Sequence, residues 1–144
     1  MNLPSLEPAE RKSLVRARLC KHADYQRAYA AARRRQSPSM SWFLAPQQAE
    51  ALPAFLRPTG PRVGLTVGKV LGKAHDRNRM KRRMREALRL HVSLLPAGFD
   101  LILHPRRSIL SIEFAKLEAE VVRLLEQARV EAARMQSAGH APHP

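Results

Sequence analysis

Apolar residues near the N-terminus recur with the spacing of an α-helix. Tyr25, Ala28, Tyr29 and Ala32 stand at i, i+3, i+4 and i+7, the positions that share one helix face. We expect this helix to end in Arg33–Arg35, because the Ser-Pro pair that follows stops it. Residues 1–15 show no such period and are expected to form a flexible arm.

Three later segments are predicted to be β-strands: Met40–Leu44, Arg62–Lys69 and Asp100–His104. Of these, Arg62–Lys69 alternates cleanly. In the first, Trp42 lies on the face expected in the core and Phe43 lies on the opposite face. In the second, Gly64, Thr66 and Gly68 share the face opposite the valines and leucine. The stretch 46–61 contains four prolines and no clear period, which indicates an irregular connection.

Two further helices are predicted in the second half of the chain. The first runs from about Arg77 to Arg89, with an apolar seam of Met80, Met84, Ala87, Leu88 and His91. Ser111 is expected to cap the second, whose apolar positions are Phe114, Leu117, Val121, Leu124, Leu125 and Ala128. This order of elements indicates an α+β or α/β sandwich of one sheet with helices against it. We expect a single domain over 16–130 and a disordered tail over 131–144.

Charge narrows the choice of partner. The chain has 144 residues, with 26 Lys and Arg against 12 Asp and Glu, and a net charge of +14. A compact protein with this excess repels itself and favours a polyanion. Nucleic acid is the first candidate and an anionic membrane surface the second. Arginine outnumbers lysine, and its forked guanidinium suits phosphate, which favours nucleic acid.

Other features of the composition exclude several classes of protein. No stretch approaches the roughly 20 apolar residues of a membrane-spanning helix. Cys20 is the only cysteine, so the chain has no intramolecular disulfide and no thiol-rich metal site. Residues 1–9 carry two prolines and one acidic residue, unlike a signal peptide. We therefore expect a cytoplasmic protein with no membrane partner.

Half of the net charge lies in one short window. Residues 69–89 have a local net charge of +7, with two acidic residues against Lys69, Lys73, Arg77, Arg79, Lys81, Arg82, Arg83, Arg85 and Arg89. At about 100° per residue, Asn78, Arg82, Arg85 and Arg89 form a stripe opposite the apolar seam. A merely solvated helix face normally mixes both signs of charge. This stripe has one sign over three turns, which favours contact with a phosphate backbone.

The residues that could carry catalysis show no pattern typical of an active site. Asp24, Asp76 and Asp100 are scattered, and the six histidines have no repeated ligand spacing. His91 continues the apolar seam and is interpreted as a packing residue. We predict no catalytic residue and no metal ligand in this chain, which disfavours a protein-only nuclease.

The run RNRMKRRMRE at Arg77–Glu86 resembles the signature helix of the protein subunit of bacterial ribonuclease P. The similarity extends over the segments that flank it: RVGLTVGKVLGKAHDRNRMKRRMREALRL (Arg62–Leu90), RLCKHADYQRAYAAARRR (Arg18–Arg35) and FDLILHPR (Phe99–Arg106). An Arg-Asn-Arg helix directly after a strand of glycine and valine is more specific than a basic helix alone. Together the resemblance covers about residues 16–128.

The resemblance implies a fold, a function and partners. The fold is an α+β single-domain sandwich of order αβββαβα with a left-handed βαβ crossover around the basic helix. General rules of chain handedness favour the opposite hand. The function is to bind a large catalytic RNA and the 5′ leader of precursor tRNA, so that the particle removes the leader. Hydrolysis is then performed by the RNA and Mg²⁺, with no organic cofactor and no obligate protein partner.

The resemblance also assigns residues to two sites. The first site binds RNA. The residues assigned to it, either by the resemblance or by their charge, are Arg77, Asn78, Arg79, Lys81, Arg82, Arg85, Arg89, Lys69 and Lys73. The cleft for the leader is implied to contain Tyr25, Tyr29, Phe43 and Thr66, because aromatic faces stack unpaired bases. The spacing of the tyrosines alone favours core packing on an amphipathic helix, and the resemblance reverses that preference. Gly64 and Gly68 are expected on the same surface, where a nucleotide backbone could approach closely.

The chain departs from the family pattern in two places. Ala30–Ala32 stand where a glycine commonly ends the first helix, so we expect that helix to run longer. Lys69 is followed by Val70 where a second lysine is common. The alternative function is that of a basic ribosomal or general RNA-binding protein without a role in processing. A reader of double-stranded DNA is disfavoured because no helix-turn-helix spacing precedes the basic helix.

Overall fold

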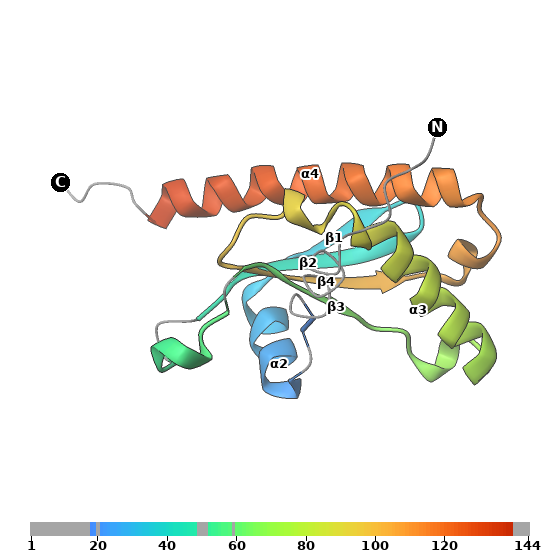
Figure 1. Cartoon of the computed structure of the whole chain (residues 1–144), viewed down its shortest axis with the longest axis horizontal. Helices are drawn as coiled ribbons and strands as arrows, with labels where there is room; N and C mark the ends of the chain where they lie inside the picture. The colour runs from blue at the N-terminus through green and yellow to red at the C-terminus, as the bar shows by residue number, and fades with distance from the viewer. Residues whose placement is uncertain (1–17, 20, 49–51, 59, 140–144) are drawn as a thin grey trace.

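The structure is a computed structural model that describes residues 18, 19, 21–48, 52–58 and 60–139. Its helices and strands are α2 (His22–Ala31), β1 (Arg34–Ser37), β2 (Met40–Pro46), β3 (Arg62–Leu65), α3 (Ala74–Arg89), β4 (Phe99–Pro105) and α4 (Phe114–Gly139). Short 3-10 turns occupy Ala54–Leu56, Lys69–Leu71, Val92–Leu94 and Arg107–Leu110. The predicted order αβββαβα is confirmed (Figure 1).

The strands form one sheet of order β1-β2-β4-β3. β2 pairs antiparallel with both β1 and β4, and β3 pairs parallel with β4. Parallel neighbours need a crossover connection, and α3 lies in the segment that joins β3 to β4. The predicted βαβ unit is therefore present, and the hand of its crossover stays a prediction.

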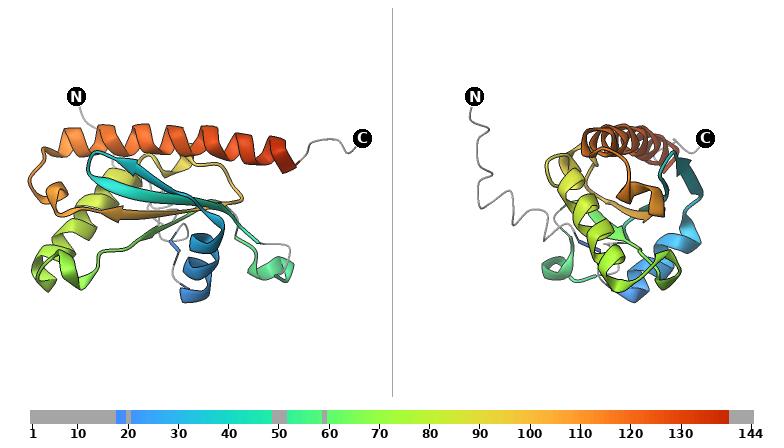
Figure 2. Two further views of the ribbon diagram at one scale, coloured as in Figure 1. Left: turned by 180° about the vertical axis from the view of Figure 1, so that it is seen from behind. Right: turned by 90° about the vertical axis from the view of Figure 1, so that its right-hand side faces the viewer.

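The two faces of the sheet carry different helices. α4 and the later part of α3 cover one face and α2 packs on the other, as Figures 1 and 2 show. The main core lies under α4 and includes Met40, Trp42, Leu101, Leu103 and Leu124. A smaller cluster lies under α2, with Leu19, Ala28, Ala45 and Ile102 buried and Tyr25, Tyr29 and Phe43 partly buried against it.

Alternation along the strands produces these two faces. Trp42 is 3% exposed in the main core, whereas Phe43 belongs to the cluster under α2. The prediction that these neighbouring residues face opposite ways is confirmed. The seam of α3 is confirmed as well, because its two methionines, Ala87 and Leu88 are all buried.

The prediction for the end of the first helix is wrong. α2 ends at Ala31, and Ala32 already has extended backbone angles. The arginines that follow belong to β1, where Arg34 faces Phe43 and Arg35 faces Trp42 in the antiparallel register. Pairing with β2 supplies backbone hydrogen bonds that a longer helix would forfeit, so tertiary contact overrides the helix propensity of the alanines.

Other boundaries also differ from the sequence predictions, and α3 starts at Ala74 rather than about Arg77. β3 ends at Leu65 rather than Lys69, because the chain turns away into the 3-10 turn at Lys69–Leu71. α4 starts at Phe114, and the Ser111 hydroxyl donates to the Ser108 carbonyl instead of capping this helix. α4 also continues to Gly139, so residues 131–139 are helical rather than part of a disordered tail. The predicted arm, 1–15, lies outside the described residues.

A buried carboxylate ties the β1–β2 hairpin to α4. Glu120 is 5% exposed, and its Oε2 accepts hydrogen bonds from the Ser37 hydroxyl at 2.6 Å and the Ser39 backbone N–H at 2.9 Å. His91 makes a similar link, with its Nε2 3.2 Å from Glu118 Oε1. His91 is half-buried and meets α4 through this contact, and its interpretation as a packing residue stays a prediction.

Candidate nucleic-acid interface

The outer surface of α3 carries basic side chains with few internal partners. Asn78, Arg79 and Arg82 are exposed, and Lys81 and Arg85 are half-buried. None of these five side chains makes a hydrogen bond or ion pair within the described part of the chain. Cations without intramolecular partners remain available to an external anion, so this surface suits a phosphate backbone.

Two of the predicted residues of α3 do have internal partners. The Arg77 Nε donates to the Gly72 carbonyl at 3.2 Å, which fixes this side chain against the turn before the helix. Arg89 pairs with Glu86 at 2.7 Å. Arg89 is therefore partly neutralised, and the outward stripe is less uniform than the sequence suggested.

The turn that leads into α3 extends the basic surface. Lys69 and Lys73 are both exposed, and Val70 between them is 95% exposed. Gly72 has a φ of +142°, a conformation that side chains rarely adopt. Arg107 crosses this glycine to donate to the Leu71 carbonyl at 2.8 Å. The turn is therefore held rigidly while both lysines point to solvent.

The second predicted site is an aromatic cluster on the α2 face of the sheet. Tyr29 is its centre, with ring centroids 6.2 Å from Tyr25, 5.1 Å from Phe43 and 5.6 Å from His104. The Tyr29 hydroxyl lies 2.7 Å from His104 Nε2 and 3.3 Å from Thr66 Oγ1. The structure thus brings together all four residues predicted for the cleft.

Gly64 has a different role from the predicted one. A Cβ at this position would overlap the hydroxyl and ring of Tyr25. The space that the missing side chain leaves is therefore filled by Tyr25, whose hydroxyl donates to the Leu19 carbonyl at 3.1 Å. Gly68 has open space around its Cα. The predicted close approach of a nucleotide backbone therefore remains possible at Gly68 and not at Gly64.

His104 belongs to the aromatic cluster, and sequence reasoning missed it. The alternation of β4 places it on the face of Ile102, opposite Leu101 and Leu103, and this was the signal that could have found it. The spacing of the histidines along the chain does not identify His104, whereas its position in β4 does. The ring contacts Tyr29 and Phe43, so it contributes a polar edge to an aromatic surface.

Burial lowers the pKa of His104 below its ordinary value of 6.5, and the positive charge of Arg34 lowers it further. Arg34 lies across the sheet face, where its Nη2 donates to the Ser41 hydroxyl at 3.2 Å. His104 is therefore neutral at pH 7, and one ring nitrogen accepts a hydrogen bond. The uncharged ring suits base stacking better than a second fixed cation would.

Arg34→Gln is expected to raise the pKa of His104, because it removes the charge but leaves the burial. The measurement is an NMR titration of the ring protons in both proteins. Since the folded pKa lies below the unfolded one, the unfolded chain binds more protons below pH 6.5 and stability declines as pH falls through this range. An identical His104 titration in the variant would show that the charge of Arg34 does not reach the ring.

An ion-pair network anchors α2, and with it the tyrosines, to the sheet. Arg62 donates from Nε and Nη2 to the two carboxylate oxygens of Asp100, each at 2.8 Å, and from Nη1 to Asp24 at 3.2 Å. Burial by itself would lower the pKa of Arg62. The hydrogen bond and charge of Asp100, followed by those of Asp24, outweigh burial and raise this pKa. Asp24 and Asp100, both buried, are therefore structural ion-pair partners.

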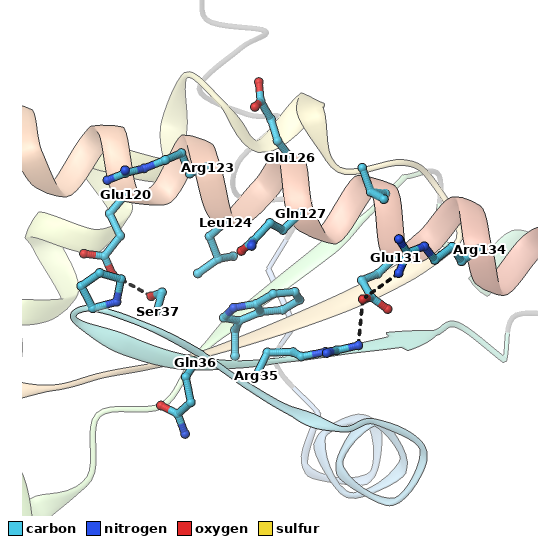
Figure 3. Close-up of a pocket in the computed structure, with 13 residues that line it drawn as sticks. Arg35, Gln36, Ser37, Glu120, Arg123, Leu124, Glu126, Gln127, Glu131 and Arg134 are labelled. Carbon is cyan, nitrogen blue, oxygen red and sulfur yellow. Dashed lines mark hydrogen bonds and ion pairs between the residues drawn. The ribbon is translucent and has the colours of Figure 1, made fainter.

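A large cavity lies away from both basic surface and aromatic cluster. It has a volume of about 810 Å³ between β1 and α4, where Arg35, Arg123 and Arg134 alternate with Glu120, Glu126 and Glu131 (Figure 3). Its charges balance, so it has no preference for a polyanion. Within the described residues, no group of three or more His, Cys, Asp or Glu side chains could hold a metal ion.

The fold and these two surfaces define a small basic α+β protein suited to nucleic acid, and comparison with known proteins specifies the family. The family model described as Ribonuclease P matches residues 15–129. The ribonuclease P protein component of Herpetosiphon aurantiacus is 32% identical over 113 residues, which cover 78% of this chain and 85% of that protein. The chain therefore belongs to the ribonuclease P protein family.

Solved structures agree with this assignment. A Staphylococcus aureus RNase P protein is 25% identical, with a TM-score of 0.63 over 79% of this chain and 96% of that one. The RNase P protein from Thermotoga maritima, 23% identical with a TM-score of 0.62, shares the fold over 76% of this chain and 96% of that one.

None of the described helices is long and apolar enough to cross a membrane.

Some relatives match over a shorter stretch. The protein component of Chloroflexus aggregans is 44% identical over 73 residues, which span 50% of this chain and 54% of that protein. The match to the Symbiobacterium thermophilum protein component spans 61% of its length. The chain thus spans between half and two thirds of these curated relatives.

Proposed function

We propose that this chain is the protein subunit of a ribonuclease P particle. In this proposal it binds the catalytic RNA through α3 and receives the 5′ leader of precursor tRNA on the aromatic cluster. The particle then cleaves the precursor in the cytoplasm to give the mature tRNA 5′ end. The observation that carries the proposal is the presence, in one small domain, of a basic helix surface with few internal partners and an aromatic cluster.

The catalytic RNA is assigned to α3 because a folded RNA presents a dense array of phosphates. Arg79, Arg82 and Arg85 can each form forked hydrogen bonds to phosphate oxygens, and each contact releases condensed counterions. Lys69 and Lys73 extend this surface beyond the start of the helix. Arg77 and Arg89 have internal partners and are proposed to contribute less.

The leader is assigned to the aromatic cluster because an unpaired strand exposes the faces of its bases. Phe43 and Tyr29 stand nearly edge to face, with an interplanar angle of 84°, so together they offer two differently oriented stacking surfaces. Stacking on aromatic rings has little sequence preference. This suits leaders that differ among tRNA genes, and Thr66 and His104 add hydrogen-bonding groups.

Hydrolysis is assigned to the RNA partner and Mg²⁺ rather than to this chain. Asp24 and Asp100 are already paired with arginines in the described structure, so neither is placed to hold a metal ion or act as a base. The chain's own contribution is to bind and orient RNA. Its positive charge also screens the phosphates that Mg²⁺ would otherwise have to neutralise, which lowers the Mg²⁺ requirement.

The test of this function is cleavage of a precursor tRNA at low Mg²⁺ concentration with a bacterial ribonuclease P RNA. Cleavage at the mature 5′ end is expected only when RNA and protein are both present. Cleavage by the protein alone would place the chemistry in this chain. Failure to stimulate a cognate RNA would favour a general RNA-binding role.

Phe43→Leu is expected to weaken binding of precursor tRNA by about tenfold in the assembled particle, because one base loses its aromatic stacking partner. Leucine keeps the apolar contact with Tyr29, so the fold is retained. Binding of mature tRNA, which has no leader, is expected to stay unchanged. The measurement is equilibrium binding of both tRNAs, and equal losses for the two would exclude Phe43 from leader recognition.

A further inference from the structure

A second aromatic position lies at the junction of α3 and α4, on the opposite side of the sheet from the tyrosines. Here an open cavity of about 450 Å³ is lined by Arg79, Arg82, Arg83, Glu86 and Phe114. We call it the α3–α4 notch. Its volume falls within the range of ligand sites in proteins. Figure 1 shows the turn that leads into α4 beside α3, and the notch is formed there.

The spacing of the helix residues explains why they share this notch. The four positions of α3 follow one another at i, i+3, i+4 and i+7, so they fall within about 100° of the helix circumference. This arc adjoins the outward stripe, and Arg82 lies where the two meet. Phe114 is the first residue of α4 and packs partly against the main core, so its ring is held in place.

The charges of the notch are predominantly positive. Arg79 and Arg82 are exposed and have no partner within the described part of the chain. The single acidic residue, Glu86, is paired with Arg89 at 2.7 Å. The notch therefore combines two available guanidiniums with one aromatic ring, in contrast to the charge-balanced cavity between β1 and α4.

Arg83 forms the inner wall of the notch. Its Nη2 donates to the Ile112 carbonyl, two residues before Phe114, so the guanidinium bridges α3 and the segment that enters α4. Its Nε is buried and has no hydrogen-bond partner in the described structure. The bridge to Ile112 therefore holds Arg83 in place, and the arginines available to a ligand are Arg79 and Arg82.

We propose that the α3–α4 notch binds a single unpaired nucleotide of a folded RNA. The base stacks on Phe114, and its phosphate is held by Arg79 and Arg82. A paired nucleotide does not fit this chemistry, because the faces of its base are covered by neighbours in the helix. The inference rests on the proposed RNA contact of α3. It adds that the protein prefers an RNA in which one base is turned out of its helix.

The test uses two RNA hairpins that differ by one bulged 2-aminopurine. Phe114→Leu keeps the apolar packing and removes the aromatic face. It is expected to lower affinity for the bulged hairpin by about tenfold and to leave affinity for the fully paired hairpin unchanged. The change in 2-aminopurine emission on binding is expected to be smaller than with the parent protein. The salt dependence of binding is expected to be unchanged, because no charge is lost.

Phe55→Leu is the matched control, since Phe55 is 85% exposed on the 3-10 turn at Ala54–Leu56 and lies outside the notch. The control is expected to leave both affinities unchanged. Thermal unfolding of both variants verifies that they are folded.

Three outcomes would overturn the inference. Equal affinity of the Phe114→Leu variant and the parent for the bulged hairpin would exclude stacking, while the basic surface of α3 would still stand. Equal losses for both hairpins would make Phe114 a general packing residue. Failure of the parent protein to bind either hairpin would overturn the RNA contact of α3 itself, and the notch with it.

Discussion

Replacing Arg82 and Arg85 together with glutamine is expected to lower affinity for ribonuclease P RNA about a hundredfold. Neither side chain has a partner within the described structure, so both are free to meet phosphates. A hydrogen bond to a charged group contributes about 1.5 kcal/mol, close to tenfold in affinity per residue. The plot of log affinity against log salt should become shallower by about 2, one unit for each lost contact.

The measurement is RNA binding by fluorescence anisotropy over a series of KCl concentrations. Arg123→Gln with Arg129→Gln is the matched control, because both arginines are exposed on α4 and the loss of charge is the same. The control is expected to keep the steep salt dependence. If the two double substitutions reduce the slope of log affinity against log salt equally, the RNA is bound by the diffuse charge of the protein. In that case α3 is not a defined interface.

Asp100→Ala is expected to cost about 3 kcal/mol of the free energy of unfolding. Asp100 has a side chain only 6% exposed and accepts hydrogen bonds from Nε and Nη2 of Arg62, whose side chain is 15% exposed. Removing one partner of a buried pair leaves the other charge poorly compensated, which is the expensive case. Asp24 still contacts Arg62 and limits the loss.

Thermal unfolding followed by the emission of Trp42, the single tryptophan, measures this effect. Glu86→Ala breaks an exposed pair and is expected to cost less than about 1 kcal/mol. Combining Arg62→Met with Asp100→Leu should recover much of the loss, because no unpaired charge remains. If Asp100→Ala costs no more than Glu86→Ala, the network does not anchor α2.

Sequence patterns predicted the features whose cause is local. The methionine and leucine seam of α3 follows from helical spacing, and the opposite orientations of Trp42 and Phe43 follow from strand alternation. The aromatic cluster itself was reached through the family resemblance, since the spacing of Tyr25 and Tyr29 alone favoured core packing. Pairing with distant strands then decided which of these residues meet.

The features that were missed depend on contacts between distant segments. Arg34 and Arg35 look like the end of a helix, and only their pairing with β2 makes them a strand. α4 extends past residue 130 because Ala132 is buried in the main core and Glu131 pairs with Arg35 at 2.8 Å. His104 acquires its role from Tyr29, which lies 75 residues earlier in the chain.

The wide separation of the residues in the aromatic cluster has a consequence for folding. Tyr29, Phe43, Thr66 and His104 meet only after β2 and β3 have both paired with β4. Such contacts require closure of long loops, and high contact order slows their formation. α3, in contrast, is one continuous segment. A chain early in folding would therefore attract RNA through its basic helix before it could discriminate a tRNA with a leader from one without.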